Sequence, residues 1–131
     1  MTAITTDYLV IGAGALGMAF ADTLLAETGA HITMVDRHAR PGGHWNDAYP
    51  FVALHQPSAS YGVASRALGS GTIDAHGPNA GLYELATGPE VTGYFNAVMQ
   101  QHFLPSGRVT YHPMSSYEGD GRIVSILSGQ E

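Results

Sequence analysis

A short apolar strand that runs directly into closely spaced glycines is the feature that most constrains this chain. Tyr8 to Ile11 are apolar β-forming residues, and the segment Gly12 to Gly17 reads Gly-Ala-Gly-Ala-Leu-Gly. This G-x-G-x-x-G spacing is typical of a buried strand that turns straight into a helix. Gly12 then permits the tight turn, Gly14 lets the main chain approach a pyrophosphate, and Gly17 lets helix and strand pack closely. We therefore expect a dinucleotide site, with phosphates at the positive end of the helix dipole.

The residues around this motif predict the first β-α-β unit. The strand is expected over about 6–11 and the helix over about 15–27, with Gly29 as its C-cap. Helical spacing predicts that the sheet-facing side carries Leu16, Ala19, Phe20, Thr23, Leu24 and Glu27. A second strand over 32–35 then leads into Asp36.

Asp36 is the first side chain with a predicted chemical role. It lies about twenty residues beyond the last glycine, where this fold places a carboxylate that accepts hydrogen bonds from an adenosine ribose. The alternative is that Asp36 only caps a loop, and the preceding glycines favour the ribose role. An acid at this position favours the unphosphorylated ribose of NAD, but Arg37 beside it could accommodate the 2′-phosphate of NADP, so the sequence does not decide between the two.

The rest of the chain alternates irregular and regular stretches. Residues 40–86 are rich in Gly, Pro and Ser, and a long loop of this kind is usually functional, so we expect it to face a cofactor. Thr87 and Glu90 fit a capping box for a helix that extends to about 103. Its apolar stripe, expected in the core, consists of Val91, Tyr94, Phe95, Val98, Met99 and Phe103. A third strand is expected over 109–114, and a hairpin over 117–127 around Asp120-Gly121.

Composition excludes several functional classes. The chain has 131 residues, of which 44% are hydrophobic, and its net charge of -6 argues against nucleic acid as a partner. It has no lysine and no cysteine, which excludes Schiff-base and P-loop lysines, disulfides and thiolate metal sites. No apolar run is long enough to cross a membrane, so we expect a soluble, cytoplasmic protein with a small-molecule substrate.

Two other kinds of site find little support in the sequence. The seven histidines lack the spacing of a metal site, so we expect no metal. Ser58, Ser60 and Ser65 do not lie in a G-x-S-x-G elbow, which argues against a nucleophilic hydrolase. His44 and His55 lie in the long loop and are candidates for cofactor contact, although either could simply orient that loop.

Three segments together resemble FAD-dependent flavoproteins with two dinucleotide-binding domains, and among them the flavin-containing and Baeyer–Villiger monooxygenases. These are the glycine motif, Asp36, and Gly42-Gly43-His44-Trp45 followed by Tyr49-Pro50. The resemblance implies a Rossmann-like parallel α/β sheet, FAD as cofactor and NAD(P)H as co-substrate. The implied cofactor-binding residues are Gly12, Ala13, Gly14, Ala15, Leu16, Gly17, Asp36, Arg37, Gly43, His44, Trp45 and His55.

Departures from the Baeyer–Villiger pattern weaken that narrower assignment. Phe51 replaces a glycine and His55 stands where that branch has an aspartate, whereas Ser58 and Tyr61 match its spacing. No catalytic residue is assigned. Trp45 and Tyr49 have core packing as their ordinary alternative.

The first strand of this fold normally has neighbours on both sides, yet the chain supplies strands for one side only. We therefore expect residues 1–131 to be the FAD-binding N-terminal part of a larger oxidoreductase. An NAD-dependent dehydrogenase domain, and a non-catalytic nucleotide-binding module or truncated product, remain the alternatives.

Overall fold

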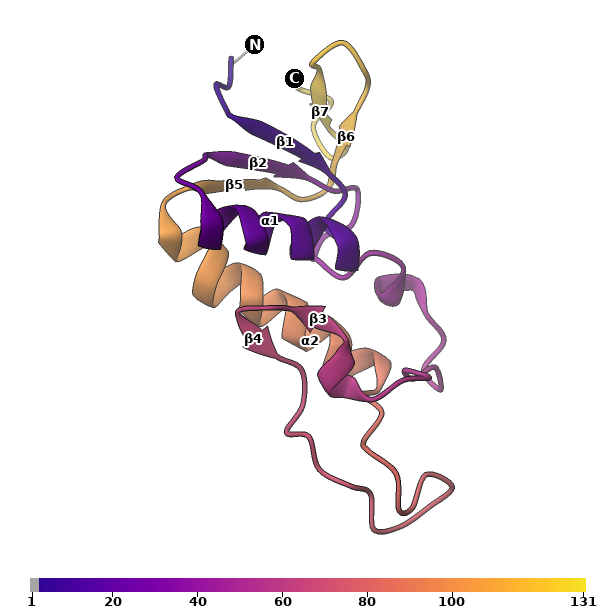
Figure 1. The fold of residues 1–131 in the computed structure, drawn as a ribbon. Helices are drawn as coiled ribbons and strands as arrows, with labels where there is room; N and C mark the ends of the chain where they lie inside the picture. Colours follow the sequence, from indigo (N-terminus) through magenta and orange to yellow (C-terminus); the bar gives the residue numbers. More distant parts are fainter. Residues whose placement is uncertain (1–2) are drawn as a thin grey trace.

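The computed structural model describes residues 3–131, which form a parallel sheet with two helices on one face (Figure 1). The elements of the β-α-β unit are β1 (Tyr8–Ile11), α1 (Ala15–Glu27) and β2 (Ile32–Val35). A long connection leads to α2 (Gly88–Val98), which is followed by β5 (Val109–His112). This element order and the Rossmann-like class are those that the sequence predicts.

The three-stranded sheet has the order β1-β2-β5, and both of its pairings are parallel. Every residue of the central strand β2 is buried. β1 lies at an edge, and its side chains Tyr8, Leu9 and Ile11 are exposed, whereas Val10 faces the helices and is buried. The apolar run of β1 therefore has neighbours on one side only within the described residues, as the sequence leads us to expect.

Helix α1 has the predicted bounds but turns a different side towards the sheet. Its buried residues are Met18, Ala21, Asp22, Leu24 and Leu25. Leu16 is 88% exposed and Phe20 is 49% exposed, so the predicted sheet-facing side is wrong for these two residues. It is right for Leu24, which is buried, and for Ala19, which packs against the core. Apolar side chains lie on more than one side of this helix, so its sequence fits more than one buried face. The expected C-cap is also wrong, because Thr28 occupies that position in an extended conformation.

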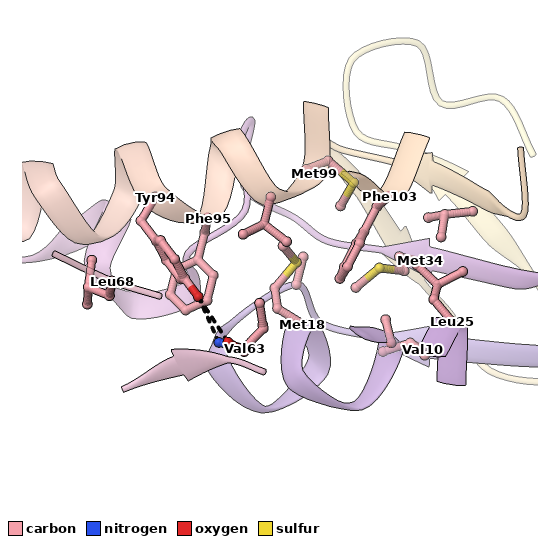
Figure 2. Close-up of a cluster of buried hydrophobic side chains, with 14 of the residues drawn as sticks. Val10, Met18, Leu25, Met34, Val63, Leu68, Tyr94, Phe95, Met99 and Phe103 are labelled. Carbon is pink, nitrogen blue, oxygen red and sulfur yellow. Dashed lines mark hydrogen bonds between the residues drawn. The ribbon is translucent and has the colours of Figure 1, made fainter. Parts of the chain in front are cut away.

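Helix α2 follows the sequence prediction closely. Thr87 and Glu90 form the capping box, and the helix continues as a π-helical turn, η3 (Met99–Phe103), and a 3-10 turn, η4 (Leu104–Ser106). All members of the predicted stripe are buried. Figure 2 shows four of these side chains, Tyr94, Phe95, Met99 and Phe103, in one cluster with Met18 and Leu25 of α1 and Val10 and Met34 of the sheet. The core therefore lies between the sheet and the two helices.

The connection between β2 and α2 contains short elements of its own. They are two 3-10 turns, η1 (Gly43–Asp47) and η2 (Ser58–Ser60), and a small hairpin of β3 (Gly62–Val63) and β4 (Arg66–Ala67). Val63 and Leu68 join the core, and the Tyr94 hydroxyl accepts the Val63 N–H at 2.8 Å (Figure 2). Beyond β4 the chain projects away from the sheet before it returns to α2 (Figure 1).

The C-terminal hairpin consists of β6 (Ser115–Tyr117) and β7 (Ile123–Ser125), paired antiparallel. Asp120 and Gly121 both have positive φ, which confirms the tight primed turn predicted there. Figure 1 shows this hairpin at the end of the sheet where β1, β2 and β5 finish. None of the helices in residues 3–131 is long and apolar enough to cross a membrane.

Candidate nucleotide-binding site

The glycine motif forms the turn between β1 and α1, and its outer glycines are needed for two different reasons. Gly12 has a φ of 104°, which side-chain-bearing residues rarely adopt, and its N–H bonds to Val35 O at 2.7 Å. A Cβ on Gly17 would lie 2.1 Å from Gly12 O, so only glycine fits there. Gly14 is the N-cap of α1, and no side chain within the described part of the chain caps this helix. The turn therefore leaves N–H groups of the first helical turn for a ligand.

The second glycine pair packs directly against the first. Gly42 N–H bonds to Ala13 O at 2.8 Å, and a Cβ on Gly43 would lie 3.0 Å from Gly14 Cα. Gly42 and Gly43 both have positive φ. The start of the long connection therefore lies beside the proposed phosphate position.

Asp36 follows β2 at the same end of the sheet and is 7% exposed. Its Oδ2 accepts the Ala13 N–H at 2.6 Å. Its Oδ1 accepts the His38 N–H at 2.7 Å and faces His38 Nδ1 at 2.8 Å. The carboxylate is thus linked to the glycine turn and to the loop that follows β2.

A pocket of about 270 Å³ opens beside Asp36. Its walls come from β1 and the glycine turn, from the end of β2, and from β6: Ile11, Gly12, Val35, Asp36, Arg37, His38, Ser115, Ser116 and Tyr117. The sequence analysis did not identify the β6 residues as part of the site. One sequence signal could have found them. The hairpin directly follows the third strand, and the carboxyl ends of parallel strands lie at the same edge of a sheet, which is the edge where the site is expected.

Burial also affects a tyrosine close to this carboxylate. Burial, and secondarily the negative charge of Asp36, raise the pKa of Tyr111 to about 12. Its hydroxyl is buried and has no hydrogen-bond partner among the described residues. The phenol therefore stays protonated at neutral pH and cannot act as a base there.

The remaining predicted residues are placed unevenly around the site. Ala15 and Leu16 open α1, and Leu16 faces solvent. Trp45 packs against the core, and its Nε1 donates to the Tyr61 hydroxyl at 3.0 Å, while His44 stacks on it with ring centroids 5.5 Å apart. His55 is exposed and lines neither this pocket nor the second one.

The second pocket, about 330 Å³, lies between the start of the long connection and the first turns of α2. It is lined by Arg40, Trp45, Asn46, Gly88, Pro89, Thr92 and Gly93. Trp45 thus packs against the core and also lines this pocket. In residues 3–131 no three His, Cys, Asp or Glu side chains are grouped as ligands for a metal ion.

Comparisons with known proteins bear on the fold of this chain. Residues 10–66 match the family model described as an NAD(P)-binding Rossmann-like domain. The chain is 64% identical over 128 residues, 98% of its length, to the uncharacterized proteins Rv2000 of Mycobacterium tuberculosis and Mb2023 of Mycobacterium bovis. It spans 24% of the length of these curated relatives.

Solved structures with the same fold include flavoenzymes. A flavin-containing monooxygenase from Stenotrophomonas maltophilia superposes with a TM-score of 0.62 at 23% identity, over 90% of this chain and 35% of that one. A mutant of a flavin monooxygenase from the same organism gives a TM-score of 0.55 at 22% identity, over 92% and 33%. Residues 10–66 are therefore similar to an NAD(P)-binding Rossmann-like domain, and the chain shares its fold with part of these two monooxygenase structures.

Proposed function

We propose that this chain binds FAD and supplies the pyrophosphate, ribose and flavin-proximal contacts of a flavin-dependent NAD(P)H oxidoreductase of the monooxygenase type. One observation carries the proposal: Gly43 packs against Gly14 in the uncapped turn, so two glycine segments lie side by side at one end of the sheet. A nucleotide with its pyrophosphate on the first segment would extend along the second, towards His44 and Trp45. The fold of the flavin monooxygenases supports the same proposal.

The residues present fit an FAD molecule. Gly12, Gly14 and Gly17 give a close main-chain approach, and the first turn of α1 offers N–H groups to phosphate oxygens. The buried Asp36 carboxylate lies beside a pocket of about 270 Å³ and would accept ribose hydroxyls. FAD when bound would supply hydride acceptance and dioxygen activation, while the protein holds and orients it. We also propose that a longer protein containing this chain uses NAD(P)H as co-substrate and oxidises a further substrate.

NAD(P) in place of FAD is the second candidate, and the description of the matching family model favours it. Calorimetric titration of the purified chain with FAD, NAD⁺ and NADP⁺ separates the two candidates. We expect FAD to bind more tightly than either nicotinamide nucleotide. Tighter binding of NAD⁺ or NADP⁺ would replace this proposal with a dehydrogenase-type site, and no binding of any of them would leave an inert module.

The substitution Gly14→Val tests the position of the site. A side chain there would meet Gly43 Cα, since even a Cβ would lie 3.5 Å from it, and would block close approach of a pyrophosphate. We expect FAD affinity to fall at least about tenfold, equivalent to about 1.4 kcal/mol. The matched control is Gly29→Val, because nothing lies within 4 Å of a Cβ at Gly29. Circular dichroism shows whether both variants are folded, and unchanged FAD affinity in a folded Gly14→Val protein would refute the site.

A further inference from the structure

His38 holds two carboxylates at once, and one of them is the ribose acceptor of the proposed site. Its Nδ1 lies 2.8 Å from Asp36 Oδ1, and its Nε2 lies 2.7 Å from Asp47 Oδ2. Ionised carboxylates only accept hydrogen bonds, so both ring nitrogens must donate, which requires the doubly protonated imidazolium. The ring thus joins the end of β2 to the end of η1, the turn that carries His44 and Trp45.

This contact uses the acceptor positions of Asp36 that a ribose would need. A carboxylate has about four such positions, two on each oxygen. Oδ1 already accepts both the backbone N–H and the ring of His38, while Oδ2 accepts only the Ala13 N–H. A ribose diol that binds across both oxygens therefore requires one donor to leave Oδ1.

The imidazole is the donor that can leave. The backbone of His38 is fixed by its own N–H bond to Asp36 and by the bond from Met114 N–H to its carbonyl at 3.0 Å. The ring, in contrast, is on a rotatable side chain that is 31% exposed and lines the pocket. Asp47 is 73% exposed and can follow the ring as it turns.

We propose that the His38 imidazolium occupies the ribose position on Asp36, and that nucleotide binding displaces the ring from Asp36 while Asp47 retains it. His38 is in this sense a positioning residue for the ribose site, and it makes nucleotide binding compete with an internal ion pair. The inference rests on the proposed nucleotide-binding function.

The proposal has a defined pH dependence. Hydrogen bonds to Asp47 and then Asp36 raise the pKa of His38 above its ordinary value of 6.5. Loss of the Asp36 contact on binding lowers that pKa, so a proton is released. Nucleotide affinity therefore increases with pH between the pKa of the bound and of the free protein, by at most about tenfold per pH unit for one proton. The other ionisable groups lining this pocket, Arg37 and Tyr117, do not hydrogen-bond the ring in the described structure.

The test measures FAD affinity from pH 6 to pH 8.5, by flavin fluorescence, for the unmodified chain and for His38→Gln and Asp47→Asn. Glutamine keeps a polar side chain but does not titrate, so the increase in affinity with pH should disappear in His38→Gln. Asp47→Asn removes the largest cause of the raised pKa, so the increase should move to lower pH. An NMR titration of the His38 ring without nucleotide should give the raised pKa and its decrease in Asp47→Asn.

The outcomes separate the two proposals. FAD binding with the same pH profile in the unmodified chain and in His38→Gln refutes this inference and leaves the FAD site standing. A His38 pKa at or below 6.5 in the free chain also refutes it. Absence of FAD binding to both proteins at every pH refutes the proposed function and this inference with it.

Discussion

Gly17 offers a sharp test of how the glycine turn is built, because a single methyl group has no space there. An added Cβ would lie 2.1 Å from Gly12 O and 3.4 Å from Val10 Cγ1, whereas Cβ contacts in proteins essentially never fall below 3.0 Å. Gly17→Ala therefore requires the turn and the helix to separate by about 1 Å, and overpacking of this kind costs about 1–3 kcal/mol. The higher helix propensity of alanine offsets up to about 1 kcal/mol of this cost.

The 2.1 Å approach is to a backbone atom, so we expect a cost in the upper part of this range, about 2–3 kcal/mol. After subtraction of the propensity gain, Gly17→Ala should lower the free energy of unfolding by about 1–2 kcal/mol. Urea unfolding followed by the fluorescence of Trp45, the one tryptophan of the chain, and by circular dichroism measures this change. The matched control is Gly93→Ala, an exposed position inside α2 where nothing lies within 4 Å of a Cβ, and it should stabilise by about 0.5–1 kcal/mol. If Gly17→Ala is as stable as the unmodified chain, the close packing of α1 on β1 is not as described.

Two further substitutions test contacts that join distant parts of the chain. Arg108 donates to the carbonyls of Leu25, Thr28 and Ala30 at and just after the end of α1. Arg108→Met should therefore lower the free energy of unfolding by about 1–2 kcal/mol, measured by urea unfolding. An unchanged unfolding midpoint would contradict this role. Tyr94→Phe leaves the buried Val63 N–H without its acceptor and should cost about 1–3 kcal/mol in thermal or urea unfolding. The control is Tyr117→Phe, because the Tyr117 hydroxyl accepts the exposed N–H of Gly121. Equal losses of stability in the two variants would argue against the buried bond.

Local sequence rules were sufficient wherever one residue type or one period decides the structure. The positive φ of Gly12 and the lack of space at Gly17 are properties of the motif itself, and the capping box at Thr87 and Glu90 acts within a single turn. The stripe of α2 was predictable because only one side of that helix is apolar. The face of α1 was not, because Leu16 and Phe20 are as apolar as the side chains that are buried.

Some parts of the candidate site were likewise predictable from the sequence, and others were not. The sequence by itself determined the strand, the glycine turn and the acid after β2, since their spacing along one β-α-β unit fixes which groups come together. Only the tertiary structure decided that Gly43 lies against Gly14, that β6 closes the pocket, and that His38 bridges Asp36 to Asp47. These contacts join segments through packing and charge in three dimensions, and no local period in the sequence encodes such a pairing.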